Sequence, residues 1–179
     1  MCVRSFRIFV FFTILTVSAT AQDRSTPQGI HSCIRFAAEF FRWYAPLTQM
    51  SLDGPAFRVA IEEKPAAFAP ELLRALQIDS QAQAKAKGEI VGIDFDPFVG
   101  SQDPTDHYAI RNAAERGRTC TVEVWRDSTH DNAATPQHPD AIAELGFSAG
   151  WQFTDFKYPD VNADLIQTLA SLQKQREKP

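Results

Sequence analysis

The first 21 residues constrain the fold most strongly, because they take an apolar segment out of the folding chain. Arg4 and Arg7 precede an unbroken run of apolar residues and threonine over residues 8–17, and Ala19 and Ala21 form a small-residue cleavage site. The run is too short to cross a bilayer, and the combination is typical of a secretory signal peptide rather than of a buried helix. The sequence therefore predicts cleavage near Ala21 and a mature protein in the periplasm or outside the cell.

The mature chain has the size of one ordinary domain. Removal of 21 of the 179 residues leaves 158, which is enough to bury a core. No later apolar stretch approaches the length of a bilayer span, so no membrane span is predicted in the mature chain. We expect a polar N-terminal tail over residues 22–29, a single domain over residues 30–173 and a solvated C-terminal tail over residues 174–179.

The charge of the mature chain limits its partners. Arg4 and Arg7 leave with the leader, so 16 basic residues remain against 22 acidic ones, a net charge of −6. Nucleic acids select proteins with a surplus of Lys and Arg, because their phosphates must be neutralised. The composition therefore argues against nucleic acid as a partner, and against anionic membrane surfaces for the same reason.

Two cysteines remain after cleavage, Cys33 and Cys120, because Cys2 lies in the leader. An even number of cysteines in an oxidising compartment is compatible with one disulfide. Two separate buried thiols fit the sequence as well, because a free cysteine packs as a small apolar side chain. The sequence leaves both alternatives open.

The hydrophobic spacing predicts helices at both ends of the domain. Apolar residues recur every three or four positions after Pro27, which indicates an amphipathic helix that ends before Pro46. A second helix is predicted to begin at Pro70, and residues 57–63 fit either a strand or a helix. Asn162 is expected to cap a last helix that begins shortly after it.

Strands are predicted between these helices. Residues 118–127 alternate between apolar and polar side chains, residues 141–147 and 151–158 read as two further strands, and residues 108–114 give a weaker signal. This order predicts an α+β fold, in which the N-terminal helices and a C-terminal helix pack on a curved, cone-like antiparallel sheet of three to four strands.

Three motifs occur in a specific order along the chain. They are Phe40-x-x-Trp43-Tyr44, the block Asp94-Phe95-Asp96-Pro97-Phe98 with Gln102-Asp103, and Trp151-x-Phe153-x-x-Phe156-x-Tyr158-Pro159. With this order and spacing the chain resembles domain-of-unknown-function family 3828, a family of bacterial envelope proteins, over about residues 30–172. The resemblance implies an envelope location and a fold similar to the nuclear-transport-factor-2-like and cystatin-like α+β folds. It implies no reaction and no catalytic residue.

The acidic block is the main candidate for chemistry. Asp94 and Asp96 are two residues apart, so both carboxylates face one side of an extended segment, and further oxygen-bearing side chains follow at Gln102, Asp103 and Asp106. Such a set has three interpretations: carboxylates that hold a sharp bend by accepting backbone N–H bonds, a surface that binds a ligand or partner, and a calcium site. The EF-hand spacing is not met, so no metal ligand is assigned and no cofactor is predicted.

Eight aromatic residues form a second candidate set: Phe36, Phe40, Trp43, Tyr44, Trp125, Trp151, Phe153 and Phe156. They are typical of an ordinary core, and also of an apolar pocket wall or a protein interface. An acid and a tyrosine in an apolar pocket are the groups that ketosteroid-isomerase-like enzymes use.

The sequence therefore predicts a secreted or periplasmic binding module for another envelope protein or a small amphipathic ligand, with no catalytic set. The alternative is a small isomerase- or hydrolase-like enzyme that uses an Asp of the 94–103 block with Tyr44. Gly100-Ser101-Gln102 lacks the spacing of a nucleophile elbow. The candidate binding residues are Asp94, Asp96, Phe98, Gln102, Asp103, Trp43 and Tyr44.

Overall fold

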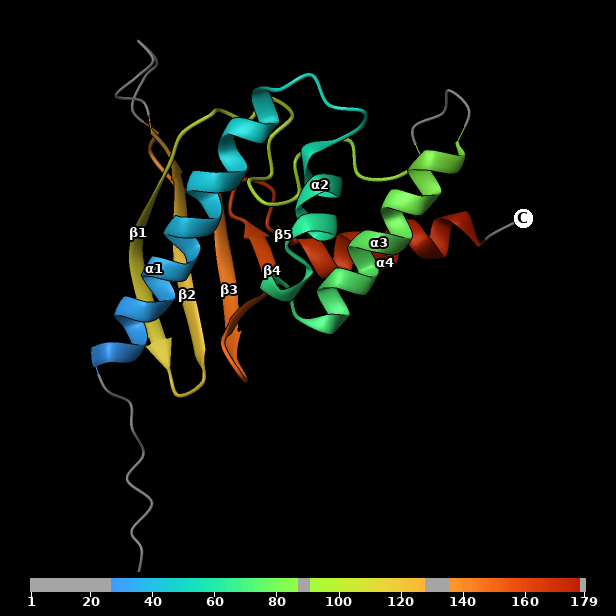
Figure 1. Cartoon of the computed structure of the whole chain (residues 1–179). Helices are drawn as coiled ribbons and strands as arrows, with labels where there is room; N and C mark the ends of the chain where they lie inside the picture. Colours follow the sequence, from blue (N-terminus) through green and yellow to red (C-terminus); the bar gives the residue numbers. More distant parts are fainter. Residues whose placement is uncertain (1–26, 87–90, 128–135, 178–179) are drawn as a thin grey trace, which may run out of the picture.

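The computed structural model describes residues 27–86, 91–127 and 136–177 (Figure 1). The predicted signal peptide and most of the polar N-terminal tail lie outside the described residues. Three helices come first, then the sheet, then the last helix. The helices are α1 (Pro27–Tyr44), α2 (Ala56–Glu63), α3 (Pro70–Lys85) and α4 (Leu165–Arg176), with 3₁₀ turns η1 (Ala45–Gln49) and η2 (Pro65–Ala67).

The sheet is open and antiparallel, and its strands follow one another in chain order. Its strands are β1 (Tyr108–Arg116), β2 (Thr119–Arg126), β3 (Ala141–Phe147), β4 (Trp151–Tyr158) and β5 (Ala163–Asp164). The α+β class is confirmed, but the prediction of three to four strands was wrong, because the sheet has five. The additional strand, β5, is only two residues long, which is too short to show an alternating pattern.

One face of the sheet carries the core. On β2 and β3, alternate residues such as Val122 and Leu145 are buried, whereas their neighbours are half-buried. On β4 the pairing register with β3 shifts and leaves Thr154 as an extra residue. The resulting bulge reverses the alternation. As a result Phe153 and Phe156, three positions apart, both lie in the core.

Helix α1 packs along β1 and β2, while α3 and α4 lie beside β4 (Figure 1). A disulfide joins Cys33 on α1 to Cys120 on β2 across 87 residues of sequence. It confirms the first of the two predicted alternatives and rules out two separate thiols. The bond ties the first helix covalently to the start of β2.

The structure decides two local predictions, one on residues 57–63 and one on the cap of the last helix. Residues 56–63 form a helix, because Phe57, Ala60 and Ile61 recur at helical spacing and are all buried. The prediction that Asn162 caps the last helix was wrong. Asn162 has a φ of 49° in the turn before β5, and Asp164 caps α4 by accepting a hydrogen bond from the backbone N–H of Gln167 at 2.8 Å.

The C-terminal tail also departs from the prediction. The helix α4 continues through Arg176, whose guanidinium donates to the buried carboxylate of Asp79 at 2.7 Å. This residue of the predicted solvated tail is therefore part of the packed domain.

Candidate functional site

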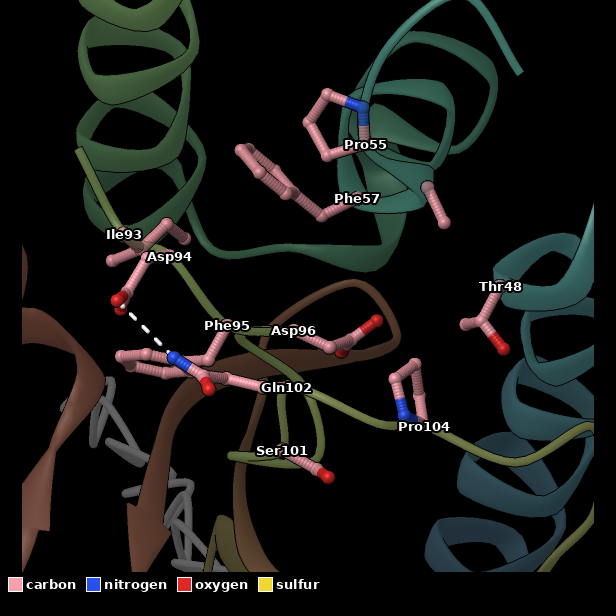
Figure 2. A pocket seen from close by; sticks show the side chains of 11 residues that line it. Thr48, Pro55, Phe57, Ile93, Asp94, Phe95, Asp96, Ser101, Gln102 and Pro104 are labelled. Carbon is pink, nitrogen blue, oxygen red and sulfur yellow. Dashed lines mark hydrogen bonds between the residues drawn. The ribbon is translucent and has the colours of Figure 1, made fainter. Parts of the chain in front are cut away.

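A pocket of about 380 Å³ opens between η1, the start of α2 and the irregular segment that follows α3 (Figure 2). The acidic block predicted from the sequence forms much of its wall. The lining residues are Thr48, Pro55, Ala56, Phe57, Ile93, Asp94, Phe95, Asp96, Ser101, Gln102 and Pro104.

A tight turn within the acidic block shapes the pocket wall. The backbone N–H of Asp96 donates to Ser101 O, and that of Gly100 donates to Asp96 O, both at 2.8 Å. Gly100 has a φ of 63°, and a Cβ at this position would lie 2.6 Å from the Tyr158 ring. Only glycine meets both requirements without strain. The turn thus depends on the glycine and on the buried ring beneath it.

Asp96 joins this turn to the first helix. Its Oδ2 accepts a hydrogen bond from the hydroxyl of Tyr44, with an O–O distance of 2.5 Å, and its Oδ1 accepts from the backbone N–H of Phe98 at 3.0 Å. Tyr44 is fully buried at the end of α1, whereas Asp96 is half-buried and lines the pocket. The carboxylate therefore has partners on the protein side and faces an open cavity on the other.

Burial controls the ionisation of this pair. Removal from water raises the pKa of Asp96 to about 6, although the hydrogen bonds from Tyr44 and Phe98 act in the opposite direction. Burial and then the charge of Asp96 raise the pKa of Tyr44 well above its usual value. Tyr44 therefore remains a neutral hydrogen-bond donor, while Asp96 titrates close to neutral pH.

Two further tyrosines surround Asp96 from the sheet side. The hydroxyl of Tyr158 on β4 donates to Pro97 O at 2.7 Å, and that of Tyr108 on β1 accepts from the backbone N–H of Thr105 at 3.0 Å. Burial raises the pKa of both phenols, and the charge of Asp96 raises them further. The charge of Asp96 therefore acts on phenols from three elements, and Tyr44 is the one that hydrogen-bonds to it.

The structure brings some predicted site residues to the pocket in an unexpected orientation. Asp94 and Gln102 both line it, and the Gln102 amide donates to Asp94 Oδ2 at 3.2 Å. Figure 2 shows the side chains of Asp94 and Asp96 pointing to opposite sides of the segment. The expectation that both carboxylates face one side was wrong, because the backbone bends at Phe95 between them instead of remaining extended.

Three other predicted residues lie elsewhere. Phe98 is fully buried among core rings and stacks on Phe68 at a centroid distance of 5.2 Å. Trp43 is half-buried, with the Lys64 ammonium 4.6 Å from its ring centroid. Asp103 is exposed and is absent from the pocket lining. Trp43 contributes to packing, as the core interpretation of the aromatic set predicted, and Phe98, a candidate binding residue, lies in the core instead of lining the pocket.

The acidic block does not converge on one point. Within the part of the chain that the structure describes, no three side chains among His, Cys, Asp and Glu are grouped as metal ligands would be. This finding contradicts the arrangement in which Asp94, Asp96, Asp103 and Asp106 close around a calcium ion. The bend-forming interpretation is supported for Asp96, which accepts the N–H of Phe98 two residues later.

Part of the wall was not anticipated from the sequence. Thr48 and Pro104 lie on one side of the pocket and Phe57 on another. The Gln49 amide donates to Pro104 O at 2.6 Å, which fixes η1 against the loop before β1. The only local signals were the proline at position 46, which ends α1, and the proline at position 104. Neither signal indicates that the two segments meet.

A G-x-S-x-G pattern at residues 146–150 also escaped the sequence analysis. It lies in the turn between β3 and β4, where the backbone N–H of Ser148 donates to Gly150 O at 3.1 Å. A nucleophile elbow requires a turn from a strand into a helix. This serine is therefore not positioned as a hydrolase nucleophile.

No protein-family model, curated protein or solved structure matches this chain. Among the described residues, no helix combines the length and the apolar composition that crossing a membrane requires. The function must therefore be argued from the pocket itself.

Proposed function

We propose that the protein binds a small molecule in the pocket beside Asp96. One observation carries this proposal: Asp96 is held on one side by the hydroxyl of Tyr44 and the N–H of Phe98, and on the other side it lines a cavity of about 380 Å³. Small-molecule sites are commonly cavities of roughly 300–1,000 Å³ with apolar walls and a few oriented polar groups. The site favours a small ligand over an envelope-protein partner. Binding to an envelope protein stays a prediction.

A melting-temperature screen of the oxidised mature protein against a library of small amphipathic molecules tests this proposal. A ligand at 100 times its Kd stabilises the folded state by about 2.7 kcal/mol. We expect a ligand that stabilises the wild type and Asp103→Asn, but not Asp96→Asn. Asp103 is a matched control, because it is an exposed aspartate of the same block outside the pocket. Equal stabilisation of all three proteins, or of none, contradicts the proposal.

Acid–base catalysis is a second candidate function, favoured by the hydrogen bond of 2.5 Å between Tyr44 and Asp96 beside the cavity. A carboxylate with a pKa of about 6 accepts a proton more readily than an ordinary aspartate. Tyr44 is fully buried, so its role in such a reaction is to position Asp96. The reaction class is proton abstraction from a bound substrate, as in the isomerase alternative drawn from the sequence.

Hydrogen–deuterium exchange at the α-carbons of cyclohexanone, followed by NMR, measures this activity without knowledge of the natural substrate. The protein-dependent rate should rise with pH through an inflection near 6, because ionised Asp96 is the base. Asp96→Asn should abolish the rate and Asp103→Asn should retain it. A rate that is the same in both variants excludes Asp96 as the base.

We also propose that the protein acts in the periplasm or outside the cell. The leader-like N-terminal sequence and the Cys33–Cys120 disulfide support this location, because structural disulfides persist in oxidising compartments. The cone-like shape and the relationship to domain-of-unknown-function family 3828 are proposals of the same kind, supported by the three sequence motifs and the α+β class. Intact mass of the exported protein tests cleavage near Ala21.

A further inference from the structure

We infer that the pocket beside Asp96 selects a small organic cation, an amine attached to an apolar group. This inference rests on the proposed function and names the class of ligand. The argument has three parts: the charge of the lining, the hydrogen-bonding state of Asp96 and the apolar walls.

The charged residues of the lining are acidic. They are Asp94 and Asp96, and none of the lining residues is Lys, Arg or His. Arg126 on β2 adjoins the wall, where its guanidinium donates to Ser101 Oγ at 3.4 Å, and it lies 3.7 Å from the carboxylate of Asp140. Arg58 on α2 comes three residues after the lining residue Pro55. Its guanidinium lies 4.0 Å from the carboxylate of Glu62. An anionic ligand would meet like charge in this pocket, whereas a cation would be attracted.

Asp96 lacks a cationic partner among the described residues. An ionised carboxylate has about four acceptor positions, and the protein supplies hydrogen bonds from the hydroxyl of Tyr44 and from the N–H groups of Phe98 and Val99. Tyr44 on α1 hydrogen-bonds to it, and its charge raises the pKa of the phenols of Tyr108 on β1 and Tyr158 on β4. Arg126 on β2 donates to Ser101 Oγ and Asp103 O instead of Asp96. A ligand ammonium would supply a donor for the remaining position and the missing positive charge.

The remaining walls suit the hydrocarbon part of such a ligand. Phe57, Ile93 and Phe95 line the pocket together with three residues that have no side-chain donor, Pro55, Ala56 and Pro104. Aromatic ring faces attract cations as well as apolar groups. The hydroxyls of Thr48 and Ser101 can orient a further polar group on the Asp96 side (Figure 2).

Calorimetric titration with benzylamine, benzyl alcohol and benzoate tests the inference, because these probes share a ring and differ in charge. At a pH well above the Asp96 pKa of about 6, benzylamine should bind at least about tenfold more tightly than benzyl alcohol, and benzoate most weakly. Asp96→Asn should remove the preference for the amine, and Asp103→Asn should retain it. Wild-type affinity for benzylamine should fall as the pH drops below about 6, a readout that needs no variant.

Equal or tighter binding of benzyl alcohol or benzoate would overturn the inference, as would an amine preference that survives Asp96→Asn. Failure of all three probes would overturn it as well. The melting-temperature screen described under the proposed function distinguishes rejection of the cationic class from failure of the proposed function itself. A neutral or anionic library ligand that depends on Asp96 would leave the proposed function standing and reject the cationic class alone.

Discussion

Asp79 and Asp96 are buried to different degrees, and their partners differ in kind. Asp79 on α3 is fully buried, and its Oδ1 receives the guanidinium of Arg176 from α4 at 2.7 Å. Its Oδ2 accepts the amide of Gln83 at 2.8 Å and the backbone N–H of Ile93 at 3.1 Å. Three hydrogen bonds therefore reach this carboxylate, and the guanidinium of Arg176 compensates its charge.

Asp96 receives its bonds from neutral donors and faces a cavity. Both aspartates act on the short segment of residues 91–96. At its start, Arg176 donates to Val91 O at 2.7 Å and Asp79 accepts the backbone N–H of Ile93. Asp96 itself forms the other end. A Cβ on Gly92 would lie 2.6 Å from Asp79 Oδ2, so the close approach requires glycine. The comparison indicates that Asp79, whose charge is compensated by Arg176, anchors the segment. Asp96, which has no cationic partner among the described residues, remains available to a ligand or a proton.

Removal of the disulfide should have the largest effect on stability. It tests whether the bond supports the position of Tyr44, the hydrogen-bond partner of Asp96. The bond fixes α1, the helix that carries Tyr44. For cysteines 87 residues apart, Cys33→Ala with Cys120→Ala should lower the free energy of unfolding by about 4–5 kcal/mol on the chain-entropy model. Urea denaturation measures the loss, and the reduced wild type should match the double variant. No loss would mean that packing alone positions α1.

Arg176→Met should destabilise the anchoring end by about 3–5 kcal/mol, because Asp79 would remain buried without its cation. Lys174→Met on the same helix is the control, since Lys174 is exposed and should change stability by less than about 0.5 kcal/mol. Adding Asp79→Asn to Arg176→Met should recover part of the loss. Equal stabilities of the Arg176 and Lys174 variants would remove the distinction between the two aspartates.

Asp96 should make the protein less stable as the pH rises, by at most about 3 kcal/mol relative to Asp96→Asn. The pKa of Asp96 in the folded state, about 6, lies above the ordinary value of 3.8, so the folded state holds the proton more tightly. The resulting stabilisation is complete below the ordinary value and is lost as the pH rises through about 6. Urea denaturation over this range, in both proteins, measures the difference. Parallel pH profiles would show that the Asp96 charge is not penalised by burial.

The smallest expected effect is that of Tyr44→Phe on the titration of Asp96. The hydroxyl of Tyr44 lowers the pKa of Asp96, so its removal should move the titration midpoint above about 6. The control Tyr158→Phe removes a buried hydroxyl that donates to Pro97 O instead of Asp96 and should shift the midpoint less. Carboxyl carbon NMR of Asp96 provides the measurement. A midpoint that stays in place would mean that the phenol does not stabilise the carboxylate.

Short-range patterns in the sequence were sufficient to predict most elements. The apolar spacing after Pro27 and Pro70 indicated α1 and α3, and alternation indicated the strands, because the helical and strand periods are properties of neighbouring residues. The cap at Asp164 was missed because the short strand before α4 is defined by pairing with β4, which leaves no periodic signal.

The candidate site was only partly predictable. The acidic block and Tyr44 were both recognised as candidates, and an Asp of this block paired with Tyr44 was one of two functional hypotheses. Nothing in the sequence selected Asp96 over Asp94, because that choice depends on a bend at Phe95 that sends their side chains to opposite sides. Asp79 was missed altogether, although a polar residue within the apolar stripe of α3 was a usable signal.

The sequence by itself determined most of the helices and strands, the acidity of the chain and the pair of cysteines available to bond, since each depends on composition or on neighbours within a few residues. Tertiary structure alone decided that Tyr44 meets Asp96 across 52 residues and that Arg176 meets Asp79 across 97. Contacts at such separations arise when packing of the core brings distant elements together. The charge state of each aspartate depends on those contacts, because burial and partners determine whether the ionised form is favoured.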